Sequence, residues 1–307
     1  MVIINYFFMC LIFGTTFLAI KIGVDAGLPP FLSAGLRFFI AGFLLFSFMI
    51  WREKTTIWLL FRKEMFFIGV GLTFGTFAAL YWAEQYVTSG IAAVLSATGP
   101  MIILVIQTFI LKQKGNWKPF IGCVVGVIGV MLLILPSFSI EISPYWMVGC
   151  FAIILGEIFY ASGTIYSKHV SLKFETTSPI ALNAAQMMHG GILLIILSFF
   201  TENIQLDFLL SPASIGSFLY LTIFGSMIGH SIYYWLVSRT NPVFPSTWLY
   251  ISPLIAVMLG ATFYHEYISW ITVIGTLTII VGTVLVNFET LRKLLWGKRT
   301  VLQDVKN

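Results

Sequence analysis

Charged side chains are scarce in this chain, since Asp, Glu, Lys and Arg together make up only 9% of its 307 residues. A soluble globular protein typically carries about 25%. Hydrophobic residues amount to 59%, which is more than a soluble core would need, so we expect lipid to be the solvent of this protein. No polar stretch is long enough for a soluble nucleotide-binding domain and no Walker-type glycine-rich loop occurs, which argues against a primary pump.

Cysteine is also rare. The three cysteines, Cys10, Cys123 and Cys150, all lie in apolar runs. We interpret them as small buried hydrophobic residues and not as a disulfide framework. The first apolar stretch lacks a basic leading segment and a clear cleavage site, so we expect it to be retained as the first helix.

Long apolar runs are what the sequence does have. A helix needs about 20 apolar residues to cross the hydrocarbon, and ten such runs are separated by proline, glycine or asparagine. They lie at roughly 2–20, 31–51, 64–83, 88–110, 118–135, 145–165, 178–200, 213–236, 241–263 and 270–288. The sequence therefore predicts an all-α membrane protein with ten transmembrane helices.

The second half of the chain repeats the first at a fixed offset of 153 residues. The matched pairs are Tyr81-Trp82 with Tyr234-Trp235, Pro100 with Pro253, Trp117 with Trp270, Gly122 with Gly275 and Gly129 with Gly282. Five spans per repeat is an odd number, so the second copy should be inverted in the membrane. We predict two inverted five-helix repeats, 1–137 and 143–289, followed by a basic cytoplasmic tail, 290–307. Inverted repeats are typical of secondary transporters, whose substrate site lies near the midplane between the halves.

The basic residues set the orientation. Of the 17 Lys and Arg residues, all but Lys21 and Arg37 fall in loops or the tail on one side of the predicted membrane. The opposite loops are mainly acidic. By the positive-inside rule the basic side is cytoplasmic, so both termini should be cytoplasmic. The net charge of +5 is thereby explained by topology and lipid headgroups, and nucleic acid is not an expected partner.

Several short motifs then resemble those of one family. They are the aromatic-glycine opening 13–21 that ends at Lys21, Leu36-Arg37-Phe38, the run 92–95 leading to Pro100, Pro245-Ser246 leading to Ser252-Pro253, and Glu266 after span nine. Along residues 5–288 or so, the chain resembles the EamA-type branch of the drug/metabolite transporter superfamily. Gln113 departs from the pattern, because an acidic residue is common there. The resemblance implies a transporter of small metabolites, amino acids or drugs, often an exporter.

Polar residues inside spans are costly, so each is a candidate for function. In span six, Glu157, Tyr160, Thr164 and Lys168 share one helix face. Glu157 is expected to contact a substrate ammonium group or to bind a proton, with a structural hydrogen bond to another helix as the alternative. Lys168 lies near the cytoplasmic end and should extend towards the headgroups.

In span eight, Ser226, His230 and Tyr233 share a face. His230 either relays protons or serves as a neutral hydrogen-bonding group, and protons are thus a candidate coupling ion. Tyr81 of span three and its repeat mate Tyr234 either line the substrate path or anchor the protein at the two membrane interfaces. Glu84 extends the polar face of span three.

Further candidates lie in spans two, seven and nine. Arg37 either binds a carboxylate, on a substrate or on Glu157 or Glu84, or reaches the outer headgroups. Pro100 and Pro253 should interrupt spans four and nine at matched positions and act in gating, because freed backbone groups must line protein or a cavity. Trp248 and Tyr250 are expected to line that region. A polar stripe on span seven, Asn183, Gln186 and His189, is most simply explained by hydrogen bonds between helices.

The leading interpretation is thus a secondary transporter of the bacterial cell membrane, working by alternating access on a small-molecule substrate without a cofactor. A membrane-embedded enzyme is the alternative from another class. It would need a nucleophile with a base, or metal ligands. His265-Glu266 begins a zinc-protease pattern, but Ser269 stands where the second histidine is required, so neither catalytic nor metal-binding residues are predicted. A passive channel is the third option, although no ring of like charges supports it. The sequence does not reveal the oligomeric state.

Overall fold

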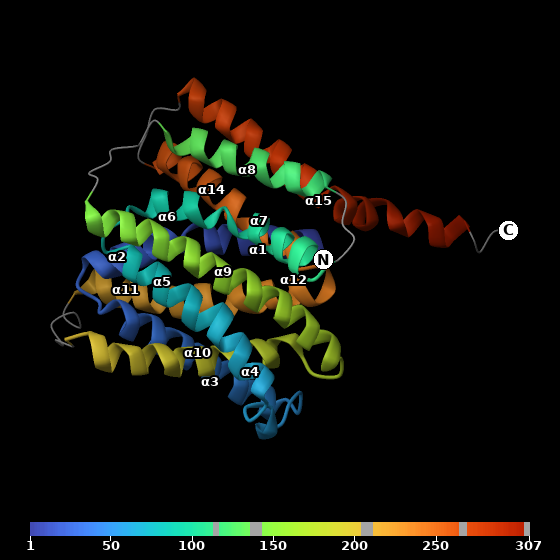
Figure 1. The fold of residues 1–307 in the computed structure, drawn as a ribbon. Coiled ribbons are helices and arrows are strands. Elements are labelled where there is room, and N and C mark those ends of the chain that lie inside the picture. Colours follow the sequence, from blue (N-terminus) through green and yellow to red (C-terminus); the bar gives the residue numbers. More distant parts are fainter. Residues whose placement is uncertain (113–116, 136–142, 204–210, 264–268, 304–307) are drawn as a thin grey trace.

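The computed structural model describes residues 1–112, 117–135, 143–203, 211–263 and 269–303, and these form helices with no β-strand among them. Figure 1 shows the helices joined by short connections. The α-helices are α1 (Val2–Gly14), α2 (Thr16–Asp25), α3 (Pro30–Trp51), α4 (Lys63–Ile68), α5 (Thr76–Ala83), α6 (Ser89–Ser96), α7 (Gly99–Val105), α8 (Lys118–Ile134), α9 (Pro144–Lys173), α10 (Pro179–Thr201), α11 (Pro212–Tyr220), α12 (His230–Arg239), α13 (Val243–Ser246), α14 (Trp248–Phe263) and α15 (Trp270–Gln303). The predicted all-helical class is confirmed for this part of the chain.

Eight helical stretches are long and apolar enough to cross a membrane. They are Val2–Asp25, Pro30–Trp51, Lys63–Ala83, Ile91–Ile110, Pro144–Lys173, Pro179–Thr201, Pro212–Arg239 and Val273–Arg292. Two shorter apolar helices, Lys118–Leu132 and Val243–Ile255, lie where spans five and nine are predicted. The structure therefore agrees with a multi-span membrane protein, while the count of ten spans stays a prediction.

Large apolar side chains cover the outside of the bundle. Phe200 is 84% exposed, Phe151 81% and Trp270 80%. Such exposure would be costly in water but is free of penalty against hydrocarbon, so these positions indicate lipid-facing surfaces. The buried residues, by contrast, include many polar ones.

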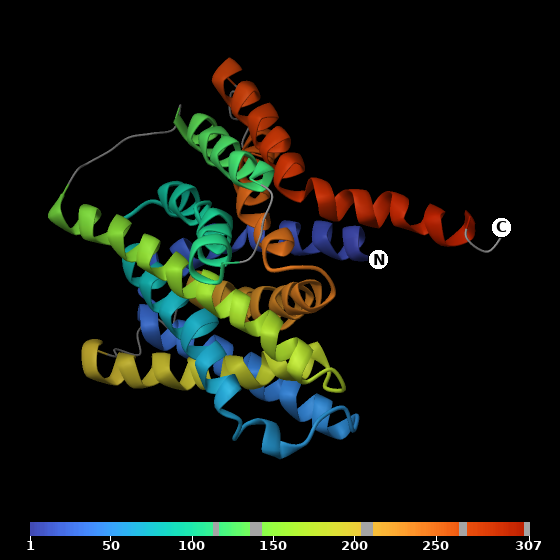
Figure 2. The ribbon, with the colours of Figure 1, turned by 45° about the vertical axis from the view of Figure 1, so that its right-hand side comes forward.

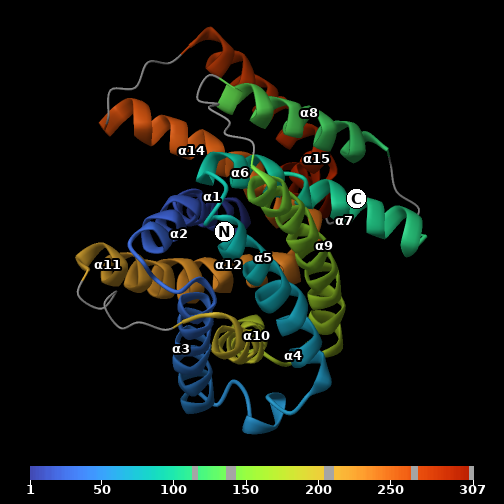
Figure 3. The ribbon, with the colours of Figure 1, turned by 60° about the vertical axis from the view of Figure 1, so that its left-hand side comes forward.

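The helices pack in pairs that bring together distant parts of the sequence. Helix α3 lies along α10, and α8 lies along α15. Figures 1 and 3 show these two pairs at opposite edges of the bundle, with α1, α2, α5, α9 and α12 between them. The middle layer is where a site between the two halves of the chain would lie.

Glycines make this close packing possible. A Cβ atom added to Gly122 would lie 2.6 Å from the backbone nitrogen of Val286, and one added to Gly282 would lie 2.5 Å from that of Gly126. Similarly, a Cβ at Gly71 would lie 2.9 Å from the Cα of Gly163. These glycines in spans three and five therefore let neighbouring helix backbones approach closely.

Several membrane-length stretches are interrupted in the middle of the bundle. Span four breaks at residues 97–98, between α6 and α7, directly before Pro100. Span nine breaks at Thr247, between α13 and α14. The expected break at Pro253 was wrong, because α14 continues through this proline. A proline removes only one backbone hydrogen bond, which a neighbouring group in a packed membrane bundle can replace.

Three segments of the described chain are π-helical. One of them, η3 (Ile106–Ile110), follows α7. The other two are η2 (Gly69–Gly75), between α4 and α5, and η6 (Leu221–Gly229), between α11 and α12. Moved by the repeat offset of 153 residues, η2 would cover 222–228, which lies inside η6. Each is followed by a side chain that bonds back to a carbonyl five residues earlier: Thr76 Oγ1 donates to Gly71 O at 2.9 Å, and His230 Nδ1 lies 2.9 Å from Gly225 O. Segments of this kind frequently occur at functional sites.

The beginning of α1 and the end of α15 lie at the same end of the bundle, and α15 extends past the other helices (Figures 1 and 2). This arrangement is compatible with termini on one side of a membrane. Gln113, His265 and Glu266, which the sequence analysis singled out, lie outside the described residues.

Candidate functional site

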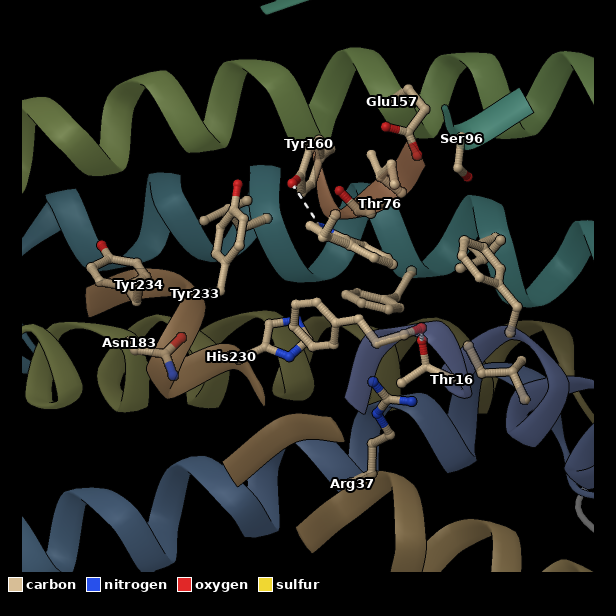
Figure 4. A pocket seen from close by; sticks show the side chains of 18 of the residues that line it. Thr16, Arg37, Thr76, Ser96, Glu157, Tyr160, Asn183, His230, Tyr233 and Tyr234 are labelled. Carbon is tan, nitrogen blue, oxygen red and sulfur yellow. Dashed lines mark hydrogen bonds between the residues drawn. The ribbon is translucent and has the colours of Figure 1, made fainter. Parts of the chain in front are cut away.

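A cavity of about 50 Å³ lies in the middle layer, between α9 on one side and α3 on the other (Figure 4). Its walls come from both halves of the chain. The lining residues are Phe13, Thr16, Phe17, Ile20, Arg37, Leu72, Thr76, Phe77, Leu80, Ser96, Glu157, Tyr160, Asn183, Gln186, His230, Tyr233, Tyr234, Trp248 and Leu249. Seven of the residues that the sequence singled out are therefore gathered here, namely Arg37, Glu157, Tyr160, His230, Tyr233, Tyr234 and Trp248.

Glu157 contributes a carboxyl group from the middle of α9. The residue is only 5% exposed, and its Oε2 atom has no hydrogen-bond partner. The side chain of Ser96, at the end of α6, interacts with the carboxyl group. A Cβ atom added to Gly99 would lie 2.4 Å from Oε2. The carboxyl group thus fits against the break in span four because residue 99 has no side chain.

Aromatic side chains surround this polar group. Tyr160 lies one turn along α9 from Glu157, and its hydroxyl accepts a hydrogen bond of 3.3 Å from Trp248 Nε1. The Trp248 ring lies 4.6 Å from that of Phe13 and 6.0 Å from that of Phe17, between centroids. The cavity is consequently walled by rings that come from α1, α2, α9 and α14.

A chain of hydroxyls holds Tyr233 in place behind this wall. The Tyr233 hydroxyl lies 2.8 Å from Thr164 Oγ1 and 3.3 Å from Ser246 Oγ. Thr164 is fully buried and does not line the cavity. It therefore acts on the site through Tyr233, although the sequence pattern correctly placed it on the same face of α9 as Glu157 and Tyr160.

Arg37 enters the cavity from the opposite wall to Glu157 (Figure 4). It donates hydrogen bonds to Tyr81 Oη at 2.7 Å and to Ser226 Oγ at 3.1 Å. Its guanidinium lies 4.3 Å from the Phe38 ring centroid and 5.1 Å from that of Phe77. In this structure hydroxyls and ring faces satisfy the guanidinium, so pairing with Glu157 or Glu84 is not what is seen.

His230 lies at the centre of the cavity wall. Its ring contacts the rings of Phe13 and Phe38 edge to face, with centroids 5.0 Å and 5.3 Å away. Because a backbone carbonyl can only accept, the Nδ1 atom near Gly225 O must carry the proton. Nε2 is then the atom left to exchange a proton or contact a solute.

Tyr81, Glu84, Tyr250, Pro100 and Pro253 lie outside this cavity. Tyr81 lines a smaller adjoining cavity of about 10 Å³ behind Arg37. Tyr250 packs against α8, where a Cβ atom on Gly126 would lie 3.2 Å from its ring. Pro100 and Pro253 are buried and do not line the cavity. Asn183 and Gln186, of the polar stripe on α10, do line the cavity. Gln186 accepts a hydrogen bond of 2.8 Å from Thr73 and donates one of 3.0 Å to Asn183, and the first of these is an expected bond between helices.

Lysine side chains join helices near the two ends of the bundle. Lys21 Nζ, on α2, donates to the backbone oxygen of Glu84 at 3.0 Å and pairs with Asp25 at 2.8 Å. Lys168 Nζ, on α9, donates to the backbone oxygen of Ser238 at 2.8 Å. Glu84 lies just past the stretch Lys63–Ala83; its carboxyl oxygens have no hydrogen-bond partner, and burial raises its pKa well above the ordinary range.

Sequence reasoning missed the aromatic wall of span one. Phe13, Phe17 and Ile20 follow one another at helical spacing and all line the cavity. The only signal was this spacing, and it occurs equally on faces turned to lipid. Thr16 and Phe77 were missed for the same reason.

The fold and its buried polar cavity define a multi-pass integral membrane protein. The model of the EamA-like transporter family matches residues 1–135 and 147–288. The chain belongs to this family.

Relatives of the chain are also named as transporters. The chain is 30% identical over 307 residues to the "Uncharacterized inner membrane transporter YedA" of Escherichia coli strain K12, covering 97% of this chain and 94% of that protein. It is 27% identical over 284 residues to the "Uncharacterized transporter YoaV" of Bacillus subtilis strain 168, covering 92% and 95%. A solved crystal structure, 16% identical, matches the fold with a TM-score of 0.72 over 93% of this chain and 96% of that one. The protein is a multi-pass protein of the cell membrane, and its general function is transport.

Proposed function

We propose that this protein is a secondary transporter that exports a small metabolite, amino acid or drug by alternating access, and that the cavity around Glu157 and His230 holds the solute. The observation that carries the proposal is the cavity itself. It is buried in the middle of the bundle, is lined by both halves of the chain and contains a carboxyl group, a histidine and an arginine. Such groups are retained inside membrane proteins mainly for function.

The packing of the helices supports two inverted five-helix repeats. Span two (α3) contacts span seven (α10), and span five (α8) contacts span ten (α15). Span one contacts span eight through α2 and α11, and span six contacts span three through α9 and α5. Each contact therefore has a counterpart in which the two repeats exchange roles. This is what a pseudo-twofold axis between the repeats would produce, and in transporters of this kind the substrate binds at that axis.

Alternating access also needs two gates, and the lysine contacts are suited to this role. Lys21 ties the first span of the first repeat to the end of the third, and Lys168 ties the corresponding spans of the second repeat. With the repeats inverted, the two contacts face opposite sides of the membrane, and breaking one would open one side. The π-helical segments and the break before Pro100 offer points where helices bend. Pro253 lies within α14 and does not break it. It is proposed as a gating residue only because it matches Pro100 in the repeat.

Protons are the proposed coupling ion, because Glu157 and His230 line the same cavity and both can bind a proton. An enzyme is a poorer explanation, since the matching family model and the names of the relatives are those of transporters. A channel is a poorer explanation too, since a channel needs a continuous polar path and this cavity is small and walled by rings.

The test is solute flux in proteoliposomes containing the purified protein. The panel comprises radiolabelled amino acids, nucleosides and toxic amphiphiles, each measured with and without an imposed pH gradient. The proposal predicts saturable flux of at least one class, with a rate that changes under the gradient. A folded protein that moves no solute of the panel would contradict it.

A further inference from the structure

The carboxyl group of Glu157 lacks a counter-charge in this structure. Its Oε2 atom is buried without a hydrogen-bond partner and lies at the wall of the cavity. An ionised carboxylate without a partner is strongly disfavoured inside a membrane protein. The group is therefore stable only when a proton or a cation joins it.

The protein itself does not supply that cation. Among the described residues, no salt bridge involves Glu157. Arg37, on the opposite wall, is held by Tyr81 and Ser226 and by two phenylalanine rings. His230 donates its Nδ1 proton to Gly225 O. A positive charge reaching Glu157 would thus have to come from a ligand.

The surroundings of Glu157 suit an organic cation. Tyr160 lies one turn along α9 from Glu157, and its hydroxyl accepts a hydrogen bond of 3.3 Å from Trp248 Nε1. All three residues line the cavity, and Phe13 packs on Trp248. The faces of tyrosine, tryptophan and phenylalanine rings attract ammonium groups and also accept apolar bodies. Carboxylate and rings together form one surface for an amine with an apolar or aromatic body.

We propose that the solute class is a small organic amine, whose ammonium group binds Glu157 while its body lies against the Tyr160, Trp248 and Phe13 rings. This proposal rests on the proposed transport function and names the substrate class of the same site. The cavity of about 50 Å³ is smaller than the roughly 150 Å³ that hold a benzene ring. An aromatic body therefore enters only when the cavity walls separate, as they do in an open state of the transport cycle.

The test compares three probes that share one body: 2-phenylethylamine, 2-phenylethanol and 3-phenylpropionate. Binding to the purified full chain in detergent is measured by calorimetry, on wild type and on Glu157→Gln. The wild type should bind the amine about tenfold or more tightly than the alcohol, since a charge-assisted hydrogen bond is lost in the alcohol. Glu157→Gln should abolish the preference. Glu64 pairs with Lys173 and does not line the cavity, so Glu64→Gln is the matched control and should keep the preference.

Equal binding of amine and alcohol by the wild type would overturn the proposal, and so would an amine preference that survives in Glu157→Gln. Should the glutamine variant not fold, Glu157→Asp keeps the charge and must retain the preference for the amine. Flux separates this proposal from the transport function. If the protein moves amino acids or nucleosides but does not bind the amine, only the proposed substrate class is contradicted. If the folded protein moves no solute, the transport function and the substrate class are both contradicted.

Discussion

Arg37 and Tyr81 join α3 to α5 through a hydrogen bond of 2.7 Å between Nη1 and the tyrosine hydroxyl. Both residues are buried, with 1% and 2% of their surface exposed. The bond closes one edge of the cavity and separates it from the smaller cavity that Tyr81 lines. It also holds a permanent positive charge in place opposite Glu157.

Tyr81→Phe should destabilise the protein by about 1–3 kcal/mol, because the buried guanidinium would lose an acceptor and keep its desolvation cost. The measurement is thermal unfolding in detergent. Tyr86→Phe is the matched control, since Tyr86 is 40% exposed and should change stability little. Equal effects of the two substitutions would show that the Arg37 contact contributes nothing.

Gly99→Ala should impair transport while the protein still inserts and folds. The added Cβ atom would lie 2.4 Å from Glu157 Oε2 and 3.0 Å from Leu249 Cδ1, so the carboxyl group would have to leave its position. Gly216→Ala is the control, because nothing lies within 4 Å of a Cβ atom there. Flux in proteoliposomes checks both variants, and wild-type flux in Gly99→Ala would show that the position of the carboxyl group is unimportant.

Glu84→Gln should alter the pH dependence of stability. Burial raises the pKa of Glu84 in the folded protein, so the folded state binds a proton more tightly than the unfolded state does. The wild type should therefore lose stability as the pH rises above about 4.3, the ordinary value for glutamate, towards the folded pKa. The glutamine variant has no such proton, so its stability relative to wild type should grow between about pH 5 and pH 8. Parallel stability curves would contradict this interpretation of Glu84.

Much of this architecture was predictable because lipid imposes simple rules. Every spanning segment must be helical and apolar, so hydropathy located the helices that the structure contains. Helical spacing also placed Glu157, Tyr160 and Thr164 on one face. These predictions depend only on local sequence.

The rest depended on packing that local sequence does not encode. Phe13 and Phe17 line the cavity, but the sequence does not distinguish a phenylalanine facing a cavity from one facing lipid. Tyr250 was expected near the site because Pro253 was expected to break its helix. The actual break, at Thr247, turns Tyr250 towards α8 instead.

The loop charges predict the orientation in the membrane, which reporters can test. A reporter active only in the cytoplasm, fused after Asn307, should give signal, because basic loops and the tail belong on the cytoplasmic side. An export-dependent reporter at the same position should be silent. The reverse pattern would exchange the two proposed gates.

Solute counterflow tests the central claim most directly. Proteoliposomes are loaded with an excess of an unlabelled solute that the flux panel identifies, and uptake of a trace of the same labelled solute is followed. A carrier that alternates between two faces predicts transient accumulation of label above its equilibrium level, and Glu157→Gln should reduce that accumulation strongly. Uptake that rises only to equilibrium, at a rate proportional to concentration and unchanged in Glu157→Gln, would contradict alternating access through this cavity.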